Sequence, residues 1–245
     1  MDAHKFIFIG GMHRSGTTLL AKLMGEHESI SSFQNTGAPM NEGQHLQNVY
    51  PDPINYGTVG LFGFNEKAYL NEKSDLITQE NKEKLFQQWS RYWDLSKPYL
   101  LEKSPPNIIR TRFLQEMFPE SCFIIIKRHP IAVSFATQKF SRRQLELNKL
   151  FNHWVICHKQ LEKDLPFINN VIVINYEDLV SNPQKVLDTI ADLLSISKFR
   201  ITNKINPSTN QKYFNRWHNL PSVERKLIFD NYQEDILDLG YSLEV

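Results

Sequence analysis

Residues 11–18, which read GMHRSGTT, have the composition of an anion-binding loop. They follow an apolar run at residues 5–9 and lead into residues 18–24, where leucines recur at the spacing of a helix face. Backbone N–H groups at the start of a helix attract an anion, and the helix dipole adds to that attraction. The glycine spacing is that of a phosphate-binding loop, but Thr17 stands where a nucleoside triphosphatase has its Lys. The cation lies instead at Arg14. We therefore predict an anion site formed by Arg14, Ser15, Gly16, Thr17 and Thr18. The alternative is a tight strand-to-helix turn with a solvated Arg.

A second polar run follows residues 122–126, which form the clearest apolar strand pattern of the chain. Arg128 leaves the end of this predicted strand, Pro130 suits the first turn of a helix, and Ser134 falls about one and a half turns into that helix. Both side chains would then reach a second phosphate. The alternative is an exposed Arg and an ordinary helical Ser. Two anion sites on neighbouring strands favour a ligand with phosphates at two ends.

Strands and helices alternate along the chain, which predicts an α/β fold with a mainly parallel sheet flanked by helices, of the P-loop nucleotide-binding type. We expect one domain over residues 1–245, in which residues 29–63 form a long loop region and residues 203–245 a C-terminal helical extension. Within that extension, residues 203–219 read as a polar segment before a last helix that ends near residue 240. The expected strands cover residues 5–9, 99–101, 122–126 and 171–174, and the expected helices cover 18–24, 78–93, 109–117, a segment after 130, 147–165 and 183–193.

The overall charge argues against two classes of partner. Lys and Arg number 28 and Asp and Glu 27, so no global positive field would steer the chain to nucleic acid or to an anionic membrane. Two cysteines are too few for a disulfide framework, and His153 and His158 are five apart, which is wrong for a helical metal pair. The N-terminal apolar run is shorter than the roughly 18 residues of a membrane span and has no signal-peptide pattern. We therefore expect a cytoplasmic protein in a reducing compartment, with no metal.

The two anion motifs, in this order, resemble the sulfotransferase family. The resemblance includes RSGTT at residues 14–18, the Arg-x-Pro-x-x-x-Ser pattern from Arg128 to Ser134, LEKSP at residues 101–105, and NYEDLVSNP at residues 175–183. It runs from residue 6 to about residue 194 and is closest to the carbohydrate and protein-tyrosine branches. It implies 3′-phosphoadenosine 5′-phosphosulfate (PAPS) as the donor and 3′,5′-bisphosphoadenosine (PAP) as the product. By this resemblance residues 14–18 bind the 5′-phosphosulfate, while Arg128 and Ser134 bind the 3′-phosphate.

Sulfuryl transfer requires alignment and a cation near the leaving oxygen more than it requires covalent chemistry. Lys103, in the matching family motif, is the first candidate for that cation, and Arg14 would share the role. For the base that takes the acceptor's proton, the loop offers Glu42 and His45. We place Glu42 first because its position resembles the branches that use Glu, although His has the better unperturbed pKa.

Two further sets of residues are weaker candidates. Lys212 and Arg216 loosely match a late cofactor-binding segment of the family. Aromatic residues of the long loop would form a wall for the acceptor, namely Tyr50, Tyr56, Phe62 and Phe64. The expected reaction is transfer of a sulfuryl group to a hydroxyl, in preference to an amine, of an acceptor that is a glycan, a phenol, a lipid alcohol or a peptide tyrosine. The alternatives are a P-loop small-molecule kinase, which would need Mg²⁺ and ATP, and a non-catalytic nucleotide-binding protein.

Overall fold

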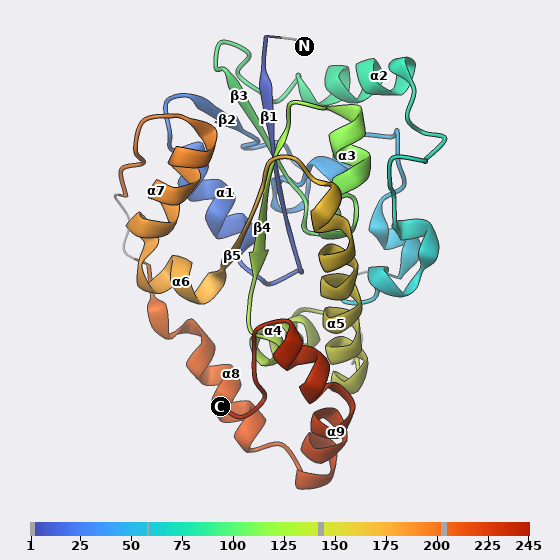
Figure 1. The fold of residues 1–245 in the computed structure, drawn as a ribbon, viewed down its shortest axis with the longest axis vertical. Helices are drawn as coiled ribbons and strands as arrows, with labels where there is room; N and C mark the ends of the chain where they lie inside the picture. The colour runs from blue at the N-terminus through green and yellow to red at the C-terminus, as the bar shows by residue number, and fades with distance from the viewer. Residues whose placement is uncertain (1–2, 58, 142–144, 202–204) are drawn as a thin grey trace.

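The computed structural model describes residues 3–57, 59–141, 145–201 and 205–245, and within them five strands form one parallel sheet (Figure 1). The strand order is β2-β3-β1-β4-β5, so β1 lies at the centre between β3 and β4. This confirms the predicted α/β fold. The strand bounds are β1 Lys5–Gly11, β2 Ile30–Ser32, β3 Tyr99–Lys103, β4 Cys122–Lys127 and β5 Val171–Asn175.

The interiors of the central strands β1 and β4 are apolar because both faces of the sheet are covered. In β1, Ile7 and Ile9 enter the core beneath α1 (Thr17–Gly25) and α7 (Pro183–Leu194), while Phe6 and Phe8 enter the opposite core. That opposite core is formed with α2 (Gln79–Trp89) and α3 (Thr111–Met117). Side chains that alternate along a strand thus supply two cores, and Figure 1 shows α1 and α7 on one side of the sheet and α2 and α3 on the other.

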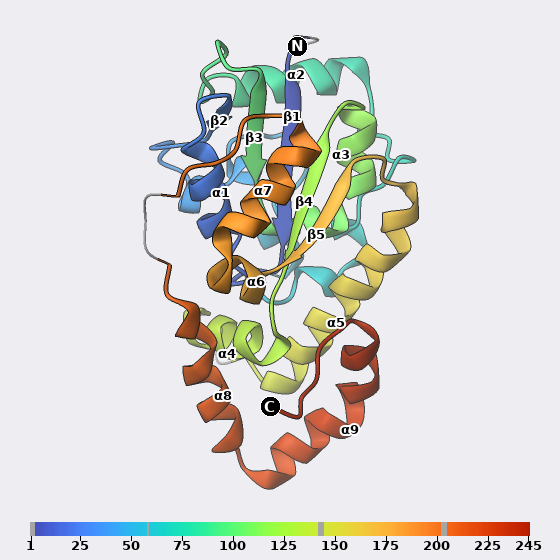
Figure 2. The ribbon, with the colours of Figure 1, turned by 60° about the vertical axis from the view of Figure 1, so that its left-hand side comes forward.

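The remaining helices lie on or near the carboxyl edge of the sheet. The long α5 (Leu147–Asp164) follows α4 (Pro130–Phe140) and packs against it, and the short α6 (Tyr176–Ser181) directly follows β5. Figures 1 and 2 show α4, α8 (Gln211–His218) and α9 (Ser222–Asp238) beyond the strand ends. None of the helices among the described residues has the length and apolar character needed to cross a membrane.

Three element boundaries differ from the sequence pattern. The loop region from residue 29 opens with β2, a three-residue edge strand that the pattern missed because two of its residues are serines. The polar segment 203–219, for which no separate helix was predicted, contains α8, whose Tyr213 and Trp217 are buried one turn apart. The predicted helix 78–93 ends at Trp89, although Trp93 still packs in the core through a turn.

The third strand continues two residues further than predicted, to Lys103. Glu102 and Lys103 pair in register with Phe8 and Ile9 and are 0% and 3% exposed. Charged residues are rarely buried to this degree without partners. Their partners are in the loop that follows β2, and they form the centre of the candidate site.

Candidate functional site

The loop after β1 has the backbone geometry of an anion site. Arg14 and Gly16 both adopt positive φ angles, 69° and 108°, and Gly16 caps α1 without a side-chain hydrogen bond. A Cβ at Gly16 would lie 2.5 Å from the Tyr176 ring, so only glycine fits this turn. The hydroxyl of Ser15 is buried and has no hydrogen-bond partner in the part of the chain that the structure describes. A polar atom buried in this way, beside an uncapped helix start, fits the phosphate end of a nucleotide.

Arg128 lies on the other side of this loop, at the end of β4, and its guanidinium is held from three directions. Nη1 donates to the Arg14 carbonyl at 2.7 Å, while Nε and Nη2 donate to Asn210 Oδ1 at 2.9 and 2.8 Å. The guanidinium carbon lies 4.1 Å from the centre of the Tyr176 ring. Burial lowers the pKa of Arg128, but guanidinium remains charged in proteins. The result is a rigid, partly buried cation next to the phosphate loop.

Asn210 was missed as a functional residue because a lone Asn carries no sequence signal. It connects Arg128 to Glu177, whose Oε1 accepts a hydrogen bond from Asn210 Nδ2 at 2.6 Å. Glu177 also accepts from the His129 backbone N–H and from the Tyr241 hydroxyl. Glu177, at the start of α6, is therefore bound to the segment that follows β4. The hydrogen bonds of Asn210 also place the start of α8 beside Arg128.

Ser134, the other residue predicted for the second anion site, makes no hydrogen bond to Arg128 among the described residues. Ser134 is fully buried, its hydroxyl has no hydrogen-bond partner among the described residues, and it lines a small cavity with His13 and His153. Lys212 and Arg216 are exposed on α8: Lys212 lies over the ring of its neighbour Tyr213, and Arg216 over Phe135. In this structure α8 therefore reaches Arg128 through an amide and the Tyr213 ring rather than through the two predicted cations.

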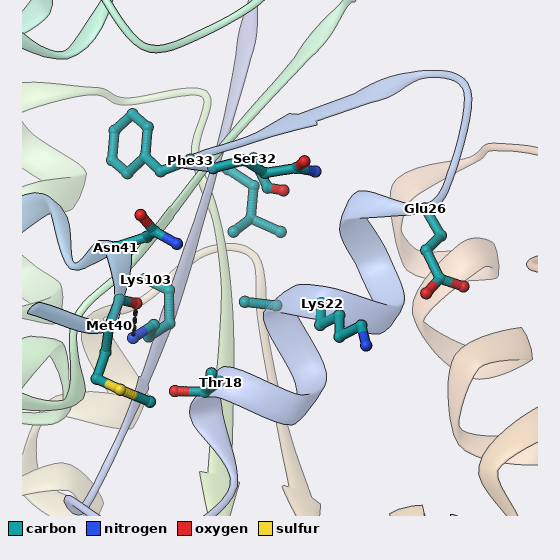
Figure 3. A pocket seen from close by; sticks show the side chains of 11 residues that line it. Thr18, Lys22, Glu26, Ser32, Phe33, Met40, Asn41 and Lys103 are labelled. Carbon is teal, nitrogen blue, oxygen red and sulfur yellow. Dashed lines mark hydrogen bonds between the residues drawn. The ribbon is translucent and has the colours of Figure 1, made fainter. Parts of the chain in front are cut away.

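Lys103 and Glu42 form a buried ion pair on the opposite side of the phosphate loop. Lys103 Nζ lies 3.1 Å from Glu42 Oε1. It also donates to the Met40 carbonyl at 2.9 Å, and Figure 3 shows this hydrogen bond. The second carboxylate oxygen of Glu42 accepts from Gln44 Nε2 at 2.6 Å. Burial lowers the pKa of Lys103, and the Glu42 carboxylate opposes that effect. Two of the residues predicted to be catalytic are therefore in direct contact.

His45, the alternative base, is bound to a carboxylate that the sequence did not single out. Its Nδ1 forms a short hydrogen bond with Asp52, and its Nε2 lies 3.7 Å from Glu42 Oε2. The hydrogen bond from Asp52 raises the pKa of His45, which favours the imidazolium. By contrast, burial lowers the pKa of the nearby His13 to about 4. The two histidines are thus shifted in opposite directions, and His13 is neutral at pH 7.

Glu102 precedes Lys103 in β3 and is enclosed by hydrogen-bond donors rather than by cations. Burial raises its pKa from 4.5 to about 7, although hydrogen bonds from Ser104 and Asn107 act in the opposite direction. The folded protein consequently binds a proton at Glu102 over a pH range in which the unfolded chain has released it. Ionisation of Glu102 therefore works against folding.

The free energy of unfolding is expected to report this ionisation. With a folded pKa of about 7 and an unfolded pKa of 4.5, the contribution of Glu102 is complete below pH 4.5 and is lost as the pH rises through 7. The loss reaches about 3 kcal/mol. Urea denaturation of the wild type and of Glu102→Gln at pH 5 and pH 8 measures it, because the variant cannot ionise. A stability difference between the two proteins that stays constant over this range would contradict the assignment.

A cavity of about 390 Å³ opens beside Lys103, between α1 and the loop after β2. Figure 3 shows Thr18 and Lys22 on one wall and Met40, Asn41 and Lys103 on the other. Because β1 lies between β3 and β4, this cavity and Arg128 are on opposite sides of the phosphate loop.

The aromatic wall predicted for the long loop is wrong for two of its four members. Tyr50 and Phe62 are 3% and 0% exposed because Tyr50 packs against Phe113 and Phe62 against His13 and His153. Tyr56 and Phe64 line a separate cavity of about 730 Å³ beside α5. Within the described part of the chain, no group of three or more His, Cys, Asp or Glu residues could hold a metal ion.

Comparisons with known proteins agree with this arrangement. The chain is similar in fold to a sulfotransferase from Alicyclobacillus acidocaldarius, with a TM-score of 0.54 and 15% identity over 92% of this chain and 96% of that one. It is also similar to the sulfotransferase domain of the Synechococcus PCC 7002 olefin synthase, with a TM-score of 0.51 and 17% identity over 93% and 94% of the two chains. A Mycobacterium avium sulfotransferase matches with a TM-score of 0.52 and 14% identity over 95% and 76%.

These similarities establish the fold, and a sequence comparison establishes the family. No curated protein sequence matches the chain. The model of the Sulfotransferase family, however, matches residues 7–200, which is most of the sequence and includes the phosphate loop, Glu42, Lys103 and Arg128. The chain therefore belongs to the sulfotransferase family.

Proposed function

We propose that this protein transfers a sulfuryl group from PAPS to a hydroxyl group of an acceptor. The observation that supports this most is the order of charged groups along the sheet edge. The buried cation Arg128 follows β4, and the uncapped start of α1 follows β1. The Lys103–Glu42 pair lies at the end of β3. These three strands are adjacent in the sheet. A donor with phosphate at both ends of an adenosine matches the first two groups and directs its sulfuryl end toward the third.

Each half of the donor has residues in this chain that fit it. The backbone at residues 14–18 and the unpartnered Ser15 hydroxyl suit the 5′-phosphosulfate, and Arg128 suits the 3′-phosphate. On the family resemblance only, Ser134 remains a candidate for the 3′-phosphate, and Lys212 and Arg216 remain candidates for donor binding. The missing Lys at Thr17 weakens the kinase alternative, because transfer from a triphosphate uses that cation.

In the proposed reaction, the bond between sulfur and the bridging phosphate oxygen breaks while a bond forms between sulfur and the acceptor oxygen. Negative charge develops on the bridging oxygen, where Lys103 and Arg14 would stabilise it. The acceptor proton passes to Glu42, whose carboxylate contacts Lys103. The cavity beside Lys103 is the proposed acceptor site, since it lies on the side of the phosphate loop away from Arg128.

Arg128→Ala tests the donor assignment directly. Hydrogen bonds to charged groups contribute about 1.5–3 kcal/mol each, so we expect PAP to bind about 100-fold more weakly to the variant. Isothermal calorimetry with PAP, and with ATP and Mg²⁺ as the comparison, measures this. Arg91→Ala is the matched control, because Arg91 is exposed just after α2 and belongs to neither predicted anion site. Preference of the wild type for ATP, or equal affinities of wild type and Arg128→Ala for PAP, would refute the proposed donor.

A further inference from the structure

Glu102 accepts hydrogen bonds from three parts of the chain at once. Oε1 accepts from the Gly43 backbone N–H at 3.0 Å and from the Ser104 hydroxyl at 2.5 Å, and Oε2 accepts from Asn107 Nδ2 at 2.6 Å. The residue is 0% exposed. The turn, Ser104 and Asn107 therefore all donate to the oxygens of this one buried side chain.

Two of these contacts hold the turn that carries Glu42. Ser104 donates to Glu102 and also accepts from the Gln44 backbone N–H at 3.0 Å, so Gly43 and Gln44 are both bound to the end of β3. On the other side of the turn, Trp89 Nε1 donates to the Gly43 carbonyl at 2.9 Å. A Cβ at Gly43 would lie 2.4 Å from Glu102 Cγ, so the close approach of turn and carboxylate requires glycine here.

The consequence is geometric. Glu42 immediately precedes the bound amides of the turn, and Lys103 immediately follows Glu102 in the strand. The turn is thus bound to Glu102 and Ser104, the residues on either side of Lys103, and a 3.1 Å contact joins Glu42 to Lys103. A movement of the turn would change the position of Glu42 relative to Lys103.

From this arrangement we propose that Glu102 is a positioning residue for sulfuryl transfer, acting through the Gly43 N–H to hold Glu42 against Lys103. The inference rests on the proposed function, in which Glu42 accepts the acceptor's proton. Glu102 itself touches neither donor nor acceptor in this scheme. The charged and titratable groups around it are Glu42 from the turn, Lys103 from its own strand, and Tyr50 and Arg110 from the neighbouring segments. None of these donates a hydrogen bond to its carboxylate among the described residues, so its position depends on the three neutral donors.

Two substitutions separate the hydrogen bond from the charge. Glu102→Met keeps the length of the side chain but has no oxygen to accept from Gly43 N–H or Ser104. Glu102→Gln loses the charge, but its amide oxygen at the Oε1 position retains both of those contacts. Only the contact with Asn107 is then lost, because the Gln amide nitrogen and Asn107 Nδ2 both donate. Turning the Asn107 amide over would not restore it, since Asn107 Oδ1 would then face the Ile9 carbonyl, to which Nδ2 donates in this structure. A positioning role therefore predicts a large effect for Met and a small one for Gln.

The activity measurement is steady-state sulfuryl transfer with a panel of hydroxyl acceptors, accompanied by PAP calorimetry. Small misplacements of reacting groups cost about 100-fold in rate, so we expect that loss of kcat in Glu102→Met, with PAP affinity within about threefold of wild type. Glu102→Gln is expected to stay within about tenfold of the wild-type kcat. Glu116→Gln, at an exposed position of α3, is the control. Equal large losses in both Glu102 variants would overturn the proposal, because the charge and not the contact would then be responsible.

A second measurement does not depend on catalysis. Hydrogen exchange of the Gly43 and Gln44 amides is expected to be at least about tenfold faster in Glu102→Met, while exchange in the core of β1 stays unchanged. Unchanged exchange at Gly43 would overturn the role of Glu102 even if the variant were inactive. If the wild type transfers no sulfuryl group but the Gly43 and Gln44 amides still exchange faster in Glu102→Met, the proposed function fails. The conclusion that Glu102 holds the turn then stands. If Glu102→Met does not fold, Ser104→Ala replaces it, since that variant removes the link to Gln44 and leaves Glu102 in place.

Discussion

Lys103→Met is expected to lower the turnover number about 100- to 1000-fold, which is the usual cost of removing one group that stabilises developing negative charge. The affinity for PAP is expected to change little, because the proposed phosphate sites, Arg128 and the backbone of residues 14–18, follow β4 and β1 rather than β3. Single-turnover kinetics with PAPS, together with PAP calorimetry, separates these two quantities. A proportional loss of PAP affinity would instead assign Lys103 to donor binding.

The ion pair complicates the interpretation of that variant, and a double-mutant cycle resolves it. Removal of Lys103 leaves the Glu42 carboxylate without its buried partner, so part of the loss could arise at Glu42. Lys103→Met, Glu42→Gln and the double variant are therefore compared. If Lys103 acts at the leaving oxygen, the double variant is slower than either single variant. A double variant no slower than Glu42→Gln would show that Lys103 acts only by supporting Glu42.

Glu42→Gln is the second substitution with a large expected effect. A positioned general base contributes about 100- to 10,000-fold to a reaction, and we expect a loss of kcat in this range. The amide keeps an oxygen that Lys103 or Gln44 can donate to, so the turn should remain in place. Circular dichroism and PAP calorimetry check that fold and donor binding are preserved. His45→Gln, in the same turn, is the matched comparison and is expected to lose about tenfold or less.

The choice between these two bases follows from their contacts. The hydrogen bond from Asp52 raises the pKa of His45, which favours the imidazolium, and the imidazolium cannot take a proton from the acceptor. If His45 were the base, kcat would increase with pH as His45 loses its proton, and Asp52→Asn would shift that increase to lower pH. Full turnover in Glu42→Gln with an inactive His45→Ala would assign the reaction to His45 and refute Glu42.

The α/β class was readable from local patterns because the sheet is buried on both faces. Runs such as Cys122 to Ile126 are apolar without alternation, and each is followed by polar residues at the strand end. The two segments that escaped prediction, β2 and α8, lack that signal. Three residues with two serines do not register as a strand, and α8 is mostly polar around Tyr213 and Trp217. Both form through tertiary contacts, β2 by pairing with β3 and α8 by packing against α4.

For the candidate site, the sequence by itself determined which residue types lie at the ends of adjacent strands: the glycine turn with Arg14, the cation at Arg128, and Lys103 after its strand. These follow from local order, because parallel strands bring their carboxyl ends to one edge of the sheet. Only the tertiary structure decided which of them touch. Glu42 and Lys103 are 61 positions apart and Arg128 and Asn210 are 82 apart, and the paths of the intervening chain place them in contact. Ser134 was assigned to the Arg128 site by spacing, yet the rotation of α4 buries its hydroxyl beside His13 and His153, because the direction of a helical side chain depends on how the helix packs.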